Sequence, residues 1–124
     1  MLQAVVALAC IVPLTAGSAG ILRGAGWLAH GPVAPDLDSH FRYMSGIFLG
    51  VGIAFASCVP RIEMKGARML MLVAFVVLGG CARLLSLLQV GAPSAGNQFG
   101  LVMELAVTPC LGLWQARLAR RWAR

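Results

Sequence analysis

Long apolar stretches alternate with short polar connectors along this chain, and the alternation predicts a membrane protein. Four stretches have the length that a helix needs to cross the ~30 Å hydrocarbon core of a bilayer, which is about 20 residues. They are residues 2–22, 38–59, 69–90 and 99–116. The pattern therefore predicts a single all-α domain over residues 1–124, folded as an integral membrane bundle of four transmembrane helices.

The composition agrees with this interpretation. Hydrophobic residues make up 60% of the chain and charged residues 11%, whereas a soluble domain carries about 25% charged residues. A water-soluble fold of 124 residues could not bury so much apolar surface. The rival interpretation of the first stretch is a cleaved signal peptide with a small-residue site at Ala16-Gly17-Ser18. The stretch is longer than a typical signal core, and no basic residue precedes it.

The basic residues predict the topology. The connector 61–68 contains two arginines and a lysine, and the tail 117–124 contains four arginines. The first connector and the start of the second helix contain only Arg23 and Arg42, and the third connector contains no basic residue. The positive-inside rule then places the 61–68 connector, the tail and both termini in the cytoplasm. We interpret the net charge of +6 as this topology signal and expect no nucleic-acid partner.

Glycines at helical spacing predict where the helices pack. Gly46 and Gly50 form a Gly-x-x-x-Gly pair on the face of Arg42, so Phe48 and Phe55 are expected to face lipid. Further helix contacts are expected at Gly79, Gly80 and Gly100. The first helix carries its own face of small residues at Ala9, Pro13, Ala16, Gly17 and Gly20.

Five ionisable residues within or beside the apolar stretches form the candidate site: Asp38, His40, Arg42, Arg83 and Glu104. In the expected topology, Arg83 and Glu104 lie ~10 Å and ~8 Å from the outer ends of their helices, at 1.5 Å per residue. An unpaired charge in hydrocarbon costs at least ~2.5–3.5 kcal/mol. We therefore expect Arg83 to pair with Glu104 across antiparallel helices, and Arg42 to pair with Asp38 along one helix.

Three interpretations of these five residues are open: a buried staple that fixes helix order, an outward-facing polar pocket for an anionic or amphipathic headgroup, and proton-linked chemistry through His40 and Glu104. No metal is expected, because only Asp38 offers a second ligand near His40. The cysteines are Cys10, Cys58, Cys81 and Cys110. Since none lies in a Cys-x-x-Cys pair, we expect small buried hydrophobes, with a redox or metal pair across helices as the alternative.

Three motifs carry a family resemblance: the run from Leu37 to Gly50, Ala82-Arg83-Leu84-Leu85-Ser86, and Met103-Glu104-Leu105. Together they resemble a family of small bacterial four-helix membrane proteins whose domain has no known function. The resemblance covers nearly the whole chain and implies a multi-pass protein of the bacterial inner (cytoplasmic) membrane. That family is loosely similar to the DoxX-like membrane proteins, whose association with redox partners implies quinone or thiol chemistry. The lack of a Cys-x-x-Cys pair argues against thiol chemistry.

The sequence favours a binding or accessory protein over an enzyme. No cofactor motif, Ser-His-Asp set or glycine-rich phosphate loop is visible, so no cofactor is expected and no catalytic residue can be named. Besides the bilayer, the expected partner is a lipid-like or quinone-like ligand or a larger membrane complex. The alternative is a subunit of a membrane redox enzyme or transporter that uses the five ionisable residues.

The topology can be tested by cysteine labelling in intact cells, on a background that lacks the four native cysteines. Met64→Cys, in the connector expected in the cytoplasm, should react with a membrane-impermeant maleimide only after permeabilisation. Ala92→Cys, in the third connector, should react in intact cells. Labelling of Met64→Cys from outside would show that the orientation is reversed.

Overall fold

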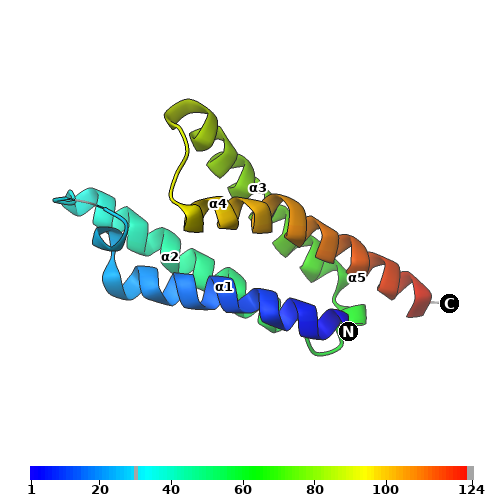
Figure 1. Ribbon diagram of the computed structural model, residues 1–124. Helices are drawn as coiled ribbons and strands as arrows, with labels where there is room; N and C mark the ends of the chain where they lie inside the picture. The colour runs from blue at the N-terminus through cyan, green and yellow to red at the C-terminus, as the bar shows by residue number, and fades with distance from the viewer. Residues whose placement is uncertain (30, 123–124) are drawn as a thin grey trace. The chain divides into compact units, whose positions relative to one another are not determined.

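The computed structural model describes residues 1–29 and 31–122, and regular structure in these ranges is helical (Figure 1). The helices are α1 (Leu2–Arg23), α2 (Pro35–Ala56), α3 (Gly66–Val90), α4 (Ala95–Val102) and α5 (Thr108–Trp122). Short 3-10 turns occupy Ala25–Trp27 and Ile62–Met64, and a π-helical turn, Met103–Val107, joins α4 to α5. The all-α prediction is confirmed. The chain forms two compact units, which we call unit 1 (Gln3–Pro60) and unit 2 (from Arg61 onward).

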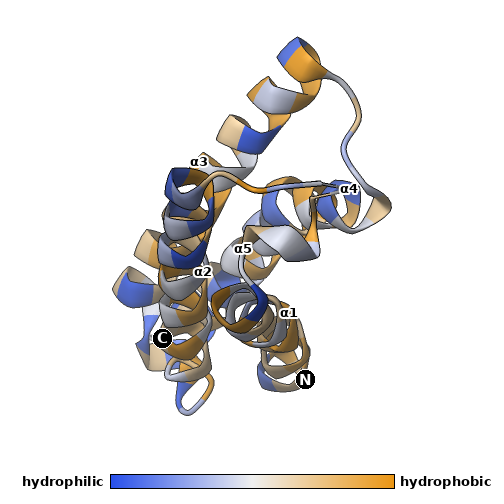
Figure 2. Cartoon of the chain, turned by 90° about the vertical axis from the view of Figure 1, so that its left-hand side faces the viewer, coloured by the Kyte–Doolittle hydropathy of each residue, from blue (hydrophilic) through white to orange (hydrophobic). Residues whose placement is uncertain are grey.

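Among the described residues, three helices are long and apolar enough to cross a membrane, which indicates a membrane protein. They are α1, α3 and the continuous 28-residue helix Ala95–Trp122 that contains α4, the π turn and α5. Figure 2 shows apolar residues along these helices. Helix α2 is not among the three, although it has 22 residues. Its first two turns carry Asp36, Asp38 and Arg42, so its continuous apolar part begins only after Arg42.

Several helix ends differ from the predicted ones, and prolines account for the difference at both ends of α2. Helix α2 begins at Pro35 instead of residue 38, since proline suits the first helical position, where no backbone N–H is needed. It ends at Ala56 instead of residue 59. Pro60 has no N–H to donate to the carbonyl of Ala56, four residues earlier, and its ring would clash with that carbonyl in a continuing helix. Helix α3 starts at Gly66 instead of residue 69. The last long helix covers Ala95–Trp122 instead of 99–116.

In unit 1, α1 and α2 form an antiparallel hairpin with very close backbone contact (Figure 1). A Cβ added at Gly17 would lie 2.8 Å from the backbone nitrogen of Leu49. Gly20 lies against the side chain of Ser45, and a Cβ at Gly52 would lie 3.1 Å from Pro13. The small-residue face predicted for α1 is therefore confirmed at Pro13, Gly17 and Gly20. These residues let the two backbones approach, as small residues do between membrane helices.

The predicted packing of Gly46 and Gly50 is wrong for this hairpin. Among the described residues, a Cβ at either position would meet nothing within 4 Å. The rotation of α2 instead turns Ser45, Leu49 and Gly52 toward α1. Phe55, which was expected to face lipid, is 9% exposed, because the same rotation buries its side of the helix.

In unit 2, α3 packs against the π turn and α5. A Cβ at Gly80 would lie 2.7 Å from the side chain of Leu105, so the packing role predicted for Gly80 is confirmed. A Cβ at Gly79 would meet nothing within 4 Å among the described residues, so Gly79 takes no part in the packing of α3 on α5. Gln115 on α5 is 2% exposed, and its Nε2 donates a 2.9 Å hydrogen bond to the carbonyl of Ile62. This bond ties the end of α5 to the connector that precedes α3.

The two glycine environments on unit 1 predict opposite effects for the same substitution. Gly17→Ala forces a methyl group into the backbone of Leu49, and overpacking of this kind costs about 1–3 kcal/mol. Gly50→Ala enters open space and gains helix propensity, worth up to about 1 kcal/mol. Thermal unfolding in detergent should therefore show a lower Tm for Gly17→Ala and an unchanged or higher Tm for Gly50→Ala. A lower Tm for Gly50→Ala alone would reverse the assignment of faces.

Candidate functional site

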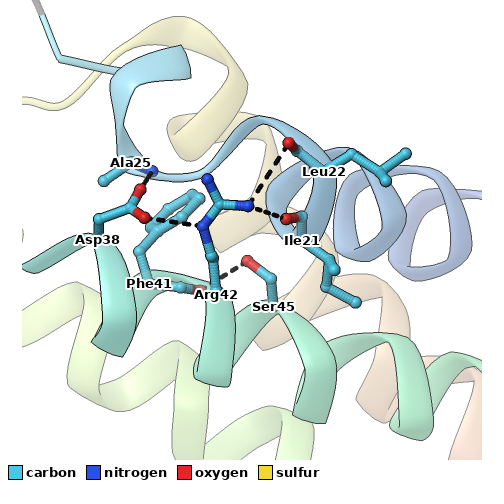
Figure 3. A network of polar contacts seen from close by, with 7 residues as sticks. All are labelled: Ile21, Leu22, Ala25, Asp38, Phe41, Arg42 and Ser45. Atoms are coloured by element: carbon cyan, nitrogen blue, oxygen red, sulfur yellow. Dashed lines mark hydrogen bonds and ion pairs between the residues drawn. The ribbon is translucent and has the colours of Figure 1, made fainter.

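The polar start of α2 forms a cluster with the end of α1 (Figure 3). Arg42 Nε donates a 2.7 Å hydrogen bond to Asp38 Oδ2, so the expected pair is present. Arg42 Nη1 donates to the carbonyl of Ile21 and, at 3.5 Å, to that of Leu22. The carbonyls in the last turn of a helix lack partners within the helix. Arg42 therefore caps α1 from the neighbouring helix.

Asp38 also holds the loop that follows α1. Its Oδ1 accepts a 2.8 Å hydrogen bond from the backbone N–H of Ala25. Gly24 comes directly before, with a φ of 66° and with its Cα against the Asp38 carboxylate, so any side chain there would be strained and would clash. The hydrogen bonds from Arg42 and from Ala25 lower the pKa of Asp38, which lies ahead of the apolar part of α2. The carboxylate is thus charged at neutral pH and holds the loop after α1 against the start of α2.

His40 takes no part in this cluster. Its side chain is exposed, and its ring centroid lies 6.4 Å from that of Tyr43. Ser45, one turn after Arg42, donates its hydroxyl to the carbonyl of Phe41 at 2.7 Å and thereby satisfies itself within α2 (Figure 3). No sequence pattern singles out Ser45, whose small size at the Gly20 contact is what α1 requires.

In unit 2, Arg83 and Glu104 form the expected ion pair between α3 and the π turn. Arg83 Nε donates to Glu104 Oε2 at 3.0 Å, and Arg83 Nη2 donates to Oε1 at 3.1 Å. Two parallel hydrogen bonds of this kind are the strongest arrangement available to an arginine and a carboxylate. Arg83 Nη1 donates a third bond, at 2.8 Å, to Asn97 Oδ1. We call these three residues the Arg83 cluster.

Glycines make room for the Arg83 cluster. A Cβ at Gly80 would lie 2.9 Å from the Cβ of Glu104, and one at Gly100 would lie 3.8 Å from Arg83 Cζ. Gly100 therefore makes its predicted helix contact with the side chain of Arg83 on α3. Glu104 is buried, at 8% exposure. The carboxylate is thus held deep between the helices, with the guanidinium outside it.

Asn97 is a site residue that the sequence analysis missed. It was assigned to the third connector, but α4 begins at Ala95, so Asn97, Gly100 and Glu104 follow one another at helical spacing. Asn97 Nδ2 also donates to Ser94 Oγ at 3.3 Å. The signal in the sequence was the spacing of Asn97, which lies three residues before Gly100 and seven before Glu104 and so shares their helix face.

The π turn aims Glu104 at α3. Pro109 has no backbone N–H to give to the carbonyl four residues earlier, and its ring crowds that carbonyl. The chain inserts a wider turn at Met103–Val107, and Thr108 Oγ1 donates a 2.8 Å hydrogen bond to the carbonyl of Met103. Such turns are frequent at functional sites, because one extra residue re-aims the side chains on either side.

The Arg83 cluster has no net charge but keeps spare hydrogen-bond donors. A guanidinium has five N–H groups; three of them serve Glu104 and Asn97, so two remain. The side chain of Arg83 is 35% exposed, against 11% for that of Glu104. The cluster therefore presents donors, and it suits a molecule that brings acceptor oxygens.

Neither metal nor disulfide chemistry is evident among residues 1–29 and 31–122. No group of three or more His, Cys, Asp or Glu side chains in these ranges could hold a metal ion. The four cysteines are free. Cys10 and Cys58 are buried as expected, but Cys81 and Cys110 are exposed, because each lies on the side of its helix that faces away from the packing contacts of unit 2.

These features define an all-helical protein with three helices suited to crossing a membrane and with an arginine–carboxylate pair in each compact unit. The chain belongs to the family of the domain of unknown function DUF4345, whose model matches residues 1–115. This match confirms the resemblance to a family of unknown function, whereas the similarity to DoxX-like proteins is not confirmed. Comparison with curated proteins and with solved structures gave no match.

The Arg83–Glu104 pair predicts strong coupling between two substitutions. Arg83→Met or Glu104→Leu alone leaves the other charge unpaired between apolar helices, which costs about 3 kcal/mol or more. The double variant should recover much of this loss, because two apolar side chains need no partner. Chemical unfolding of the four proteins in detergent measures the coupling free energy. Additive effects of the two single changes would contradict an energetic link between these residues.

Proposed function

We propose that this protein is a small multi-pass protein of a bacterial cytoplasmic membrane that binds a lipid-like molecule at the Arg83 cluster and serves as a binding or accessory protein. The observation that carries the proposal is the half-exposed guanidinium of Arg83. It lies on a helix apolar enough to cross a membrane, and its two remaining N–H groups have no partner among the described residues. Unmet donors in apolar surroundings are costly, and a ligand oxygen would satisfy them.

The proposed topology has four spans, with α2 as the fourth, and both termini in the cytoplasm. The hairpin of unit 1 supports it, because a crossing α1 requires its antiparallel partner α2 to return. The distribution of basic residues supports the orientation. The Arg83 cluster would then lie in the outer half of the bilayer, within reach of lipid headgroups. Arg83 is seven residues from the end of α3 at Val90, which is ~10 Å.

The charge balance of the cluster favours a neutral acceptor as ligand. Glu104 already neutralises Arg83, so an anionic headgroup would bring an excess negative charge next to a buried carboxylate. A quinone or ester carbonyl brings acceptor oxygen without that charge. A backbone carbonyl on a partner subunit's helix would offer the same chemistry, so a larger membrane complex is the competing occupant.

The alternative of a redox-enzyme or transporter subunit has less support from the geometry. Proton-linked chemistry through His40 and Glu104 needs the two side chains to communicate, but both carboxylate oxygens of Glu104 accept hydrogen bonds from Arg83. His40 is exposed on unit 1 and contributes to neither arginine–carboxylate pair. The five predicted residues therefore offer no acid–base pair in contact.

The proposal predicts a co-purifying lipid-like molecule that depends on the Arg83 cluster. The protein, extracted with its native lipid, would be analysed by native mass spectrometry and by organic extraction. The wild type should carry about one equivalent of a single neutral acceptor lipid, and the Arg83→Met/Glu104→Leu variant should lose it. Ser86→Ala, one turn further along α3, should keep it. A folded double variant that retains the molecule contradicts the proposal, and a co-purifying protein in place of a lipid supports the partner-subunit alternative.

A further inference from the structure

The outward side of α5 changes from apolar to cationic along its length. Leu111 and Gln115 face the interior of unit 2 and are buried. On the opposite side, Leu113 is 60% exposed and Trp114 is 37% exposed. Within two turns after them, the same side carries three exposed arginines: Arg117, Arg120 and Arg121.

The three arginines share one helix face and lack protein partners. Their spacing, i, i+3 and i+4, places them side by side on the surface of α5. None of the three side chains makes an ion pair or hydrogen bond among the described residues. Three adjacent guanidinium groups raise the positive potential of this face, which attracts an anion.

We propose that this outward face of α5 binds an anionic phospholipid, with an acyl chain along Cys110 and Leu113 and the phosphate on the three arginines. Leu113 and Arg117 are four residues apart, or ~6 Å along the axis, so one lipid can reach both. Arginine takes phosphate oxygens through two parallel hydrogen bonds. Trp114, three residues before Arg117, borders this face with a ring suited to the membrane–water interface, and Trp122 lies in the same final turns of α5.

The positive-inside rule requires cations near the membrane but does not require them to continue an apolar helix face. A second group of cations in unit 2 allows the two cases to be compared. The Gln115–Ile62 hydrogen bond holds the connector at the same end of the unit as the arginines. Arg61 and Lys65 on that connector are cationic too, but they flank the buried Ile62 instead of continuing an exposed apolar stripe. If net charge alone attracted lipid, Arg61 and Lys65 would contribute as much to lipid binding as two of the arginines on α5.

Fluorescence quenching can test the site with the full-length protein, delipidated in detergent. Trp27→Phe leaves Trp114 and Trp122 as reporters. Phosphatidylglycerol brominated in its acyl chains should quench them at much lower concentration than brominated phosphatidylcholine. Arg117→Gln/Arg121→Gln should weaken phosphatidylglycerol binding roughly 30-fold, at about 1 kcal/mol for each arginine. The matched control, Arg61→Gln/Lys65→Gln, should change it by less than about threefold.

A charge-preserving variant keeps the test decisive if the glutamine variant loses its fold by circular dichroism. Arg117→Lys/Arg121→Lys retains the cations but not the bidentate geometry, so we expect a loss smaller than that of glutamine but measurable. Equal weakening by both glutamine pairs would overturn the proposal, since net charge would explain it. Equal quenching by the two lipids would overturn it as well. Displacement of the brominated lipid by a short RNA duplex would identify a general polyanion surface instead.

Discussion

A charge among apolar helices must bring its own partner, and this constraint organises both units of the protein. In unit 1, Asp38 holds Arg42, and the pair joins the start of α2 to the end of α1. In unit 2, Glu104 holds Arg83, and the pair joins α3 to the π turn. Each pair lies toward the end of its helix hairpin where the connecting loop joins the two helices. The electrostatic penalty for separating either pair therefore acts directly on helix register.

Close backbone contact is the second half of this arrangement. Lipid chains are as apolar as leucine, so membrane helices gain little from the hydrophobic effect and rely on packing and polar bonds. Gly17 and Gly20 bring α1 onto α2, and Gly80 brings α3 onto the chain around Glu104. In unit 2 the two devices depend on each other. A side chain at Gly80 would push Glu104 away, and the bidentate geometry with Arg83 would be lost.

The ion pairs could be predicted from the sequence, because an isolated charge among apolar helices is costly. Charges are rare in the apolar stretches, so Arg83 and Glu104 had few other partners, and the antiparallel helices brought them together. The Gly46 and Gly50 prediction failed because a Gly-x-x-x-Gly pair gives a spacing and does not say which neighbour it meets. Asn97 was missed because α4 starts at Ala95, four residues before the predicted start of that helix, so Asn97 was assigned to the connector.

Other parts depend on three-dimensional detail that a helical pattern does not contain. Pro109 cannot continue the regular α-helical hydrogen bonds, and the chain accommodates it with a π turn that redirects Glu104. Arg42 was expected to pair with Asp38 along one helix, and it does. Its bonds to the carbonyls that end α1 depend on the path of the loop through Gly24, whose positive φ brings Ala25 back to Asp38. Capping between helices is a tertiary property, so periodicity alone could not indicate it.

The two partners of the Arg83–Glu104 pair differ in exposure. Here the carboxylate lies inside and the guanidinium outside, at 11% and 35% side-chain exposure. Glu104 fixes the plane of Arg83 through two bonds, and Asn97 fixes it through a third. The two remaining N–H groups of Arg83 are therefore held in defined directions, a property that the proposed binding site would use.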